Sequence, residues 1–509
     1  MARVIRRWVA FLALALMLPT ATEACASSGA LSTISTKGTD LIVADATALP
    51  PTLDPFKVYG TQTQSFFRLF FEPLFDRDPD GKIRTPLLER WGPVDRLTWE
   101  FRLRPGVRFH DGGELTSADV VYSLERILNP DSSRRHEFAE FDTITAVDTY
   151  TLRITTKRPY PLLPARLSQF SMILPDQLRG RPEAEFFREP IGLGPFQLSQ
   201  LNPDQAVLTA FQNYHGGPPK VPRVVFQFIP DAGVRLDRLL AGDVDIVTNL
   251  LPQQVNSLLR AKGVRLIKRS SIRFMDVLID NRNGPLAKVE VRQALLHGTD
   301  VEGLVRYVAR GNGNAISTVT LPDDFGFHNG LKPYAFDPAK ARALLAQGGY
   351  PNGFRLQGLA THDTQTLATA LAQQWAKLGV KLEVAVEGRA PTMTRWIKEK
   401  DKQHDFLILD PTSIIFDAAF QLRLHLDPAH PMSRMSPLPR VVNLLNTADT
   451  EQNSDARAGI LREVQKIAYD EGLTIPLYQV VDLYAVRDRV TGFTASKDTI
   501  LRLGGVGLQ

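Results

Sequence analysis

Alternating apolar and polar residues open the stretch from Leu97 to Leu128. Apolar side chains alternate with charged ones from Trp99 to Leu103, which is the pattern of a strand with one buried face. Pro105-Gly106 interrupts the pattern, because proline lacks an amide N–H and glycine admits positive φ. The alternation resumes over Val107 and Phe109, so the two segments together predict a β-hairpin.

A capped amphipathic helix is predicted after this hairpin. Asp111-Gly112-Gly113 is a turn signal, and Thr116 precedes Asp119 by three residues, which is close to a capping box. Apolar residues then recur at helical spacing, at Val120, Leu124, Ile127 and Leu128. The charged residues of the unit fall on solvated faces, so we expect it to be scaffold that touches no ligand.

The first residues have the pattern of a secretory signal peptide. The apolar run from Trp8 to Leu18 is too short to cross a bilayer, and it follows Arg3, Arg6 and Arg7. Small residues follow Pro19 as far as Ala26. We therefore expect residues 1–24 to be removed and the mature protein to be periplasmic. A buried N-terminal helix is the alternative.

Cys25 is the only cysteine of the chain, so no disulfide can form within it. A lipid anchor on Cys25 is a second interpretation of the same region. The preceding residues, Thr22-Glu23-Ala24, argue against it, because a leucine is usual three places before a lipid-bearing cysteine. We expect an unanchored protein that folds without a disulfide because its size permits a large core.

Composition limits the partners and the number of domains. A chain of 509 residues corresponds to roughly three domains of about 150 residues each. It is 43% hydrophobic and 23% charged, which is ordinary for a globular protein. The formal charge of +5 is small for this length and includes no basic block, so nucleic acid is not an expected partner.

Motifs of catalysis are absent from the sequence. It contains no G-x-S-x-G, no H-E-x-x-H and no G-x-x-x-x-G-K-[ST], and its single cysteine lies beside the signal peptide. His425 and His430, with Asp427 between them, are a candidate metal pair, although a solvated loop is the more ordinary explanation. We expect a binding protein rather than an enzyme, with no metal and no cofactor.

Several longer motifs resemble those of one family. They include "TLDPF" (52–56), "FEPLFDRDPDGKIRTPLLERW" (71–91), "LRPGVRFHDGGELTSADVVYSLERI" (103–127) and "IPLYQ" (475–479). In this order they are similar to the periplasmic solute-binding proteins of ABC transporters, peptide/nickel-binding type (bacterial extracellular solute-binding family 5). The resemblance covers about residues 40 to 495.

The resemblance implies an α/β protein with two lobes, of the type II periplasmic binding protein fold with an extra subdomain. The ligand cleft would lie between the lobes, which two strands would join as a hinge. The main lobe would contain residues 38–70, 185–265 and 485–509. The inserted subdomain would span 71–184, and the second lobe 266–484. Closure would be a rigid-body movement driven by ligand contacts.

Candidate ligand-binding residues also follow from the resemblance. Tyr59 and Gln62 follow the "LDP" turn, and Asn249 follows "GDVDIVT". Trp396 precedes "HDFLIL" near the place of a pocket aromatic, with a core tryptophan as the alternative. Tyr478 lies in "IPLYQ", at the expected junction of the lobes.

The stretch "HDFLILDPTSIIFDAAF" (404–420) departs from the family pattern. Peptide-binding members carry an aspartate there that pairs with the free amino group of the peptide. An ungapped match places Ile414 at that position, whereas a gap of three residues would place Asp417 there. Asp410 and Thr412 of the same stretch are further candidates, and a solvated loop is the alternative for either aspartate.

The implied function is the substrate-binding component of an ABC importer. It would capture a peptide or another small organic solute in the periplasm and deliver it to a membrane permease and its ATPase, as a monomer. An exported hydrolase on the same fold is a different interpretation, which the absence of a nucleophile–base pair disfavours. A chaperone or a signalling receptor that uses the same cleft is a third.

Overall fold

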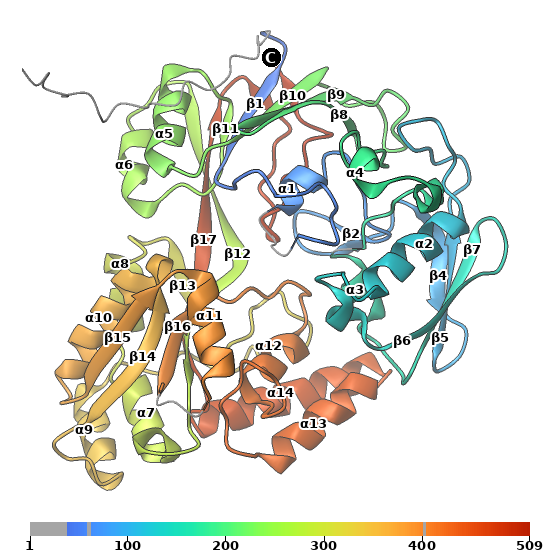
Figure 1. Cartoon of the computed structure of the whole chain (residues 1–509). Coiled ribbons are helices and arrows are strands. Elements are labelled where there is room, and N and C mark those ends of the chain that lie inside the picture. Colours follow the sequence, from blue (N-terminus) through green and yellow to red (C-terminus); the bar gives the residue numbers. More distant parts are fainter. Residues whose placement is uncertain (1–37, 59–62, 170, 401–403) are drawn as a thin grey trace, which may run out of the picture. The chain divides into compact units, whose positions relative to one another are not determined.

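The computed structural model describes residues 38–58, 63–169, 171–400 and 404–509 (Figure 1). The signal-peptide segment, Cys25, Tyr59 and Gln62 lie outside these described residues. The expectations for them therefore stay predictions.

An 11-stranded sheet that mixes parallel and antiparallel pairs runs through this part of the chain. Its strands, in their order across the sheet, are β15 (Lys381–Glu387), β14 (Arg355–Thr361), β16 (Phe406–Leu409), β12 (Val264–Ile279), β17 (Ile475–Arg487), β11 (Ile246–Val247), β1 (Leu41–Asp45), β10 (Arg223–Phe228), β9 (Gln205–Ala210) and β8 (Phe196–Asn202), with β13 (Gly313–Ala315) paired to β17. The sequence of β1, "LIVAD", is almost continuously apolar because β1 is buried between two parallel neighbours, β10 and β11.

Smaller sheets complete the strand inventory. An antiparallel sheet of four strands has the order β4 (Leu88–Pro93), β5 (Thr98–Leu103), β7 (Thr151–Thr156) and β6 (Phe141–Ala146). Two further sheets have two strands each, β2 (Asp76–Arg77) with β3 (Ile83–Arg84) and β18 (Val490–Thr491) with β19 (Gly507–Leu508).

Helices follow or cover these sheets along the chain (Figure 1). They are α1 (Gln64–Phe67), α2 (Ser117–Leu128), α3 (Leu163–Leu167), α4 (Glu183–Phe186), α5 (Ala232–Ala241), α6 (Val255–Leu258), α7 (Val289–His297), α8 (Val301–Tyr307), α9 (Pro338–Gln347), α10 (Gln365–Ala376), α11 (Arg389–Lys398), α12 (Ala418–Leu426), α13 (Pro439–Thr450) and α14 (Ser454–Asp470).

Buried apolar side chains form three large groups within the described ranges. The first core combines residues between Leu41 and Ile246 with residues between Tyr484 and Val506. The second core surrounds β14 and β16 and includes residues of α7 and α10. The third core lies between α12, α13 and α14. β12 and β17 therefore connect the first core to the second, because β17 pairs with β11 at one end and β12 pairs with β16 at the other.

The capped helix predicted after Asp111-Gly112-Gly113 is confirmed, since α2 begins at Ser117. The Asp119 carboxylate accepts hydrogen bonds from both the backbone N–H and the hydroxyl of Thr116, at 2.8 Å each. This is the capping-box arrangement that satisfies an otherwise unpaired donor at the helix start.

The predicted hairpin is wrong in its second strand. β5 pairs with β4 and β7, not with the segment that contains Val107 and Phe109. Those two side chains are buried, but their segment folds back locally, with Leu115 N–H donating to the Val107 carbonyl at 2.8 Å. The glycine pair after Asp111 permits this tight return, so the segment satisfies its backbone groups there.

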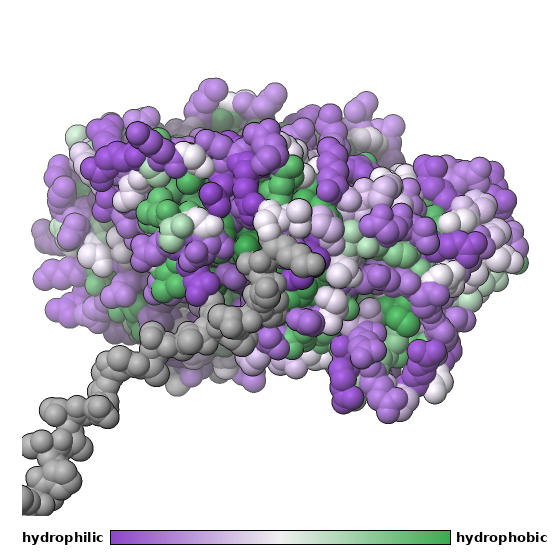
Figure 2. Space-filling model, turned by 90° about the horizontal axis from the view of Figure 1, so that it is seen from above, coloured by the Kyte–Doolittle hydropathy of each residue, from purple (hydrophilic) through white to green (hydrophobic). Residues whose placement is uncertain are grey.

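Charged and polar residues dominate the face shown in Figure 2, where hydrophobic residues form small separate areas. Scattered apolar residues of this kind are normal for a water-exposed surface. Within the described ranges, no helix has both the length and the apolar character needed to cross a membrane.

Candidate functional site

The candidate site lies where β12 and β17 cross from one core to the other. These strands pair along most of their length, but the register shifts between Ser270 and Phe274 of β12. The shift is a β-bulge, a feature that bends a strand and redirects its side chains. The polar pair Ser270-Ser271 lies at the start of this bulge. Before it, apolar and charged residues mix along β12, and after it the strand is mostly apolar.

Two other segments attach to β12 at this bulge. The Ile272 N–H donates to the Lys497 carbonyl at 3.1 Å, and the Ser413 N–H donates to the Ile272 carbonyl at 2.8 Å. Lys497 belongs to the last part of the chain, which contributes to the first core, whereas Ser413 belongs to residues 410–417, which we call the 410–417 loop. The bulge is therefore a meeting point of the first core and this loop.

Arg273 is the charged residue at the centre of the bulge. Its Nη2 donates to Oδ1 of Asp482 on β17 at 2.5 Å. The Asp482 side chain is 2% exposed, whereas that of Arg273 keeps 29% of its surface exposed. Asp482, and to a smaller extent Asp410, raise the pKa of Arg273, so its positive charge is secure.

Thr412 faces Arg273 across an isolated antiparallel bridge. The flanking hydrogen bonds, from Phe274 N–H to the Pro411 carbonyl and from Ser413 N–H to the Ile272 carbonyl, make this a non-hydrogen-bonded pair. In such a pair the two side chains lie on one face of the sheet and close together. The structure therefore brings the predicted residue Thr412 beside Arg273.

Asp410 follows β16 directly and forms an ion pair with Arg389 of α11. The Asp410 side chain is largely buried, whereas Arg389 is about half exposed. Such a pair with an exposed partner contributes little to stability. Asp410 therefore lies close to the Arg273–Thr412 pair, and among the described residues its one ion-pair partner is an arginine that solvent reaches.

Asp417, the alternative candidate, has a structural role. It is the N-cap of α12 and accepts a hydrogen bond from Ala419 N–H at 3.0 Å. Both of its carboxylate oxygens also accept from Arg457, at 2.6 and 3.0 Å, and both side chains are buried. In this structure the cap and Arg457 occupy the carboxylate, and the role of Asp417 as a ligand residue stays a prediction.

Ile414 lies between these two aspartates and is half buried against the first core. Its neighbour Ile415 belongs to that core and accepts a hydrogen bond from Nη2 of Arg77 at 2.9 Å. The Arg77 guanidinium also lies 4.4 Å from the centre of the Phe416 ring. The middle of the 410–417 loop is therefore fixed to β2.

Asn249 lies near the other end of this region. It follows β11 with a φ of 48°, a left-handed conformation that asparagine adopts more readily than most residues. Its carbonyl accepts from Nη2 of Arg235 at 2.8 Å, and the next residue, Leu250, donates its N–H to the Leu483 carbonyl at 3.1 Å. Asn249 thus lies beside the part of β17 that carries Asp482.

Trp396 and Tyr478 are both buried in apolar surroundings. Trp396 is fully buried in α11, and its indole N–H donates to the Met432 carbonyl at 2.7 Å. The structure thus supports the core alternative for this tryptophan. Tyr478 is 3% exposed within the second core, between Met275 and Ala315, and burial raises its pKa to about 12.

His425, of the candidate metal pair His425 and His430, forms hydrogen bonds within the protein. His425 Nε2 lies 2.6 Å from Oδ2 of Asp276, and its Nδ1 lies 2.7 Å from the Gln421 carbonyl. Burial lowers the pKa of His430 to about 4. In the described ranges, no group of three or more histidine, cysteine, aspartate or glutamate side chains is arranged to hold a metal ion.

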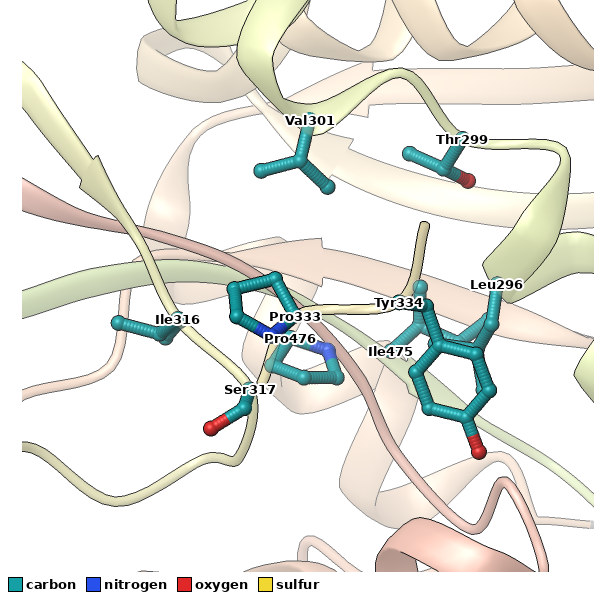
Figure 3. A pocket seen from close by; sticks show the side chains of 9 residues that line it. All are labelled: Leu296, Thr299, Val301, Ile316, Ser317, Pro333, Tyr334, Ile475 and Pro476. Carbon is teal, nitrogen blue, oxygen red and sulfur yellow. The ribbon is translucent and has the colours of Figure 1, made fainter. Parts of the chain in front are cut away.

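A small cavity lies within the second core and contains none of the candidate residues (Figure 3). Its volume is about 10 Å³, room for one water molecule at most, whereas a site for an organic ligand needs several hundred Å³. It is lined by Leu296, Thr299, Val301, Ile316, Ser317, Pro333, Tyr334, Ile475 and Pro476. This cavity is therefore not the solute site.

Comparison with known protein families shows to which family this chain belongs. The family description "Bacterial extracellular solute-binding proteins, family 5 Middle" matches residues 82–432, well over half of the chain. The chain belongs to this family. Its predicted resemblance is thereby confirmed, and so is the expectation of a binding protein rather than an enzyme. The chain is an extracellular solute-binding protein.

Individual relatives agree with this membership. The chain is 29% identical over 343 residues to the glutathione-binding protein GsiB of Salmonella typhimurium, covering 65% of this chain and 67% of the relative. It is 27% identical over 468 residues to heme-binding protein A of Haemophilus influenzae, covering 81% and 82%. The solved structure of HbpA2 from Haemophilus parasuis shares the fold with a TM-score of 0.81 at 24% identity, covering 92% of this chain and 100% of that one. The expected mixed α/β class is thereby confirmed.

Arg273 and Asp482 are the residues of this region that the sequence patterns did not identify. A signal was present, since Arg273 interrupts the apolar series Ile272, Phe274 and Met275 in a strand. A charge in such a series needs a partner or a solvent path. The partner lies 209 positions later in the sequence, which local patterns do not show.

Proposed function

We propose that this binding protein captures a small organic solute in the periplasm and delivers it to a membrane permease coupled to an ATPase. The observation that carries the proposal is the course of β12 and β17, which both pass from the first core to the second. Two strands are few enough to bend as a hinge, and Asn249, Arg273, Thr412 and Asp410 lie along their junction.

The lobes of this proposal follow the predicted boundaries. The main lobe consists of 38–70, 185–265 and 485–509, with 71–184 as its inserted subdomain, and the second lobe is 266–484. The composition of the cores supports this division, because the first core contains few residues between 266 and 484 and the second core lies wholly inside that range. The solute would bind in a cleft between the lobes.

Small-angle X-ray scattering tests closure around a solute. The radius of gyration should decrease when the purified monomer is saturated with its solute, because rigid lobes approach each other without refolding. Circular dichroism should stay unchanged in the same samples. An unchanged radius at saturation would argue against two lobes that close.

Export is tested at the N-terminus. We propose cleavage after residue 24 and release to the periplasm without a lipid on Cys25. N-terminal sequencing and intact mass of protein from the periplasmic fraction should give a chain that begins at Cys25 or Ala26 with no added mass. A cytoplasmic chain that retains residues 1–18 would contradict this.

Ordinary peptides should be poor ligands. The relatives' names give different ligands, glutathione and heme, so the ligand class has to come from the residues of this chain. Ile414 offers no charge to a buried ammonium, and Asp417 is occupied by Arg457. We expect unmodified di- and tripeptides to bind at least about a hundredfold more weakly than the physiological solute. Submicromolar calorimetric binding of such peptides would contradict this.

A further inference from the structure

We propose that the solute carries a carboxylate and that Arg273 binds it. This inference rests on the proposed function, because it specifies the chemistry of the same junction.

Two buried arginines with a structural role in this protein, Arg292 and Arg235, use most of their donors. Arg292 donates five hydrogen bonds to the carbonyls of residues 286, 287, 471 and 472, at 2.8–3.2 Å. Arg235 donates four, to the carbonyls of residues 229, 230, 248 and 249. Both side chains are buried, as expected when a guanidinium serves only to bind carbonyls.

Arg273 differs from both of them. Of the five N–H donors that a guanidinium provides, one is used within the described part of the chain, by Asp482 at 2.5 Å. The remaining donors include a pair on one edge of the group, and the side chain is 29% exposed. A guanidinium edge of this kind matches the two oxygens of a carboxylate.

Neighbouring carboxylates do not fill this edge. Asp410 is paired with Arg389, and Asp276 is paired with His425 at 2.6 Å. Asp482 holds Arg273 from its buried side, since Asp482 is 2% exposed. The open edge is therefore left for a group from outside the described chain.

The carboxylates around Arg273 favour a ligand group with a single negative charge over one with a double negative charge. Asp410 and Asp482 are both close enough to raise the pKa of Arg273, and their charges oppose a second charge on the ligand. A phosphate monoester would meet this repulsion, whereas a carboxylate brings only one charge. Thr412 lies on the same face as Arg273, and its hydroxyl is a second donor beside the guanidinium.

The test uses the exported full-length chain without its signal peptide. Native mass spectrometry would measure capture from a defined mixture of amine-free and N-acetylated monocarboxylic acids and their methyl esters. The wild type should capture acids and not esters. Arg273→Gln should weaken the capture of the acids at least tenfold, which corresponds to about 1.4 kcal/mol. Arg273→Lys should capture the acids more weakly than the wild type and more strongly than Arg273→Gln.

Two further variants control for folding. Arg269→Gln is the matched control, because Arg269 lies on the same strand, is 26% exposed and pairs with Asp80 at 2.5 Å. It should bind the acids as the wild type does. The double variant Arg273→Gln/Asp482→Asn avoids a buried unpaired carboxylate, so it should fold normally and still fail to bind the acids.

The outcomes separate this inference from the proposed function. Three results would overturn the inference and leave the proposed function intact. In the first, the wild type captures acids and esters equally. In the second, Arg273→Gln captures the acids as well as the wild type does, and in the third the wild type captures only solutes that lack a carboxylate. A wild type that holds no solute as purified and captures none from any mixture would count against the proposed function itself.

Discussion

Asp410 and Asp417 lie at the two ends of one loop, but their surroundings are opposite. Asp417 is enclosed, with Arg457 on both of its oxygens and the start of α12 on one of them. Asp410 forms an ion pair with Arg389, whose side chain is 49% exposed. Two carboxylates of the same loop therefore have different surroundings, one buried against Arg457 and the other paired with an arginine that solvent reaches. The difference comes from what packs around each of them.

The largest expected effect concerns the enclosed end. Asp417→Asn should lower the free energy of unfolding by about 3–5 kcal/mol, because it leaves the buried Arg457 without its charge partner. Urea denaturation monitored by circular dichroism measures this change. The control is the same substitution at Asp410, and a loss at Asp417 as small as at Asp410 would remove the distinction between the two ends.

Phe416, next to Asp417, gives a second test. A Cβ on Gly81 would collide with the Phe416 ring, and the φ of 89° at Gly81 is unfavourable for other residues. Gly81→Ala should cost about 1–3 kcal/mol of unfolding free energy. Gly106→Ala is the matched control, since its φ is 80° and nothing lies near its Cβ. Equal losses would show that backbone strain, rather than the ring, sets the cost.

The stability of the protein is expected to depend on pH through Asp324, which contacts the middle of the 410–417 loop. Asp324 is buried and accepts a hydrogen bond from the Ser413 hydroxyl at 2.7 Å, and burial raises its pKa to about 7. Because the folded pKa lies above the unfolded value of 3.8, stability from this group is present below pH 3.8 and is lost as pH rises toward 7. The loss should reach at most about 1.4 kcal/mol per pH unit.

Asp324→Asn checks this assignment. Urea denaturation at several pH values should show a flatter dependence for the variant than for the wild type between these limits, because the titrating group is gone. Parallel curves for the two proteins would mean that Asp324 does not titrate in this range.

The smallest effect on stability is expected at the open end. Asp410→Asn should change the unfolding free energy by less than about 1 kcal/mol, because its partner is exposed, and Arg389→Gln should behave alike. A solute with only a carboxylate should bind Asp410→Asn no more weakly than the wild type, because a repelling charge is removed. Weaker binding by calorimetry would indicate that the solute also carries a cation that pairs with Asp410.

The sequence predicted local structure well where one segment determines it. The capping box of Thr116 and Asp119 acts within four residues, so α2 was found correctly. The Val107–Phe109 strand was wrong because alternation shows burial and does not specify the partner. The family motifs determined the class of fold and of function over most of the chain.

The site was less predictable because its residues depend on distant partners. Asp417 looked available in sequence, yet Arg457, forty positions later, occupies it. Trp396 looked like a pocket aromatic and is a core residue held by Met432. Arg273 was overlooked because its partner Asp482 belongs to another strand. Local patterns carry no information about such pairings.

The first core also has a consequence for synthesis on the ribosome. It combines residues from Leu41 onward with residues between Tyr484 and Val506, and β11 pairs with the end of β17. Translation delivers these two sets at its beginning and at its end. The first core therefore stays incomplete until the last part of the chain has emerged, whereas the helices of the third core can pack slightly earlier. The residues between Leu41 and Ile246 therefore wait for their last core partners until the end of synthesis.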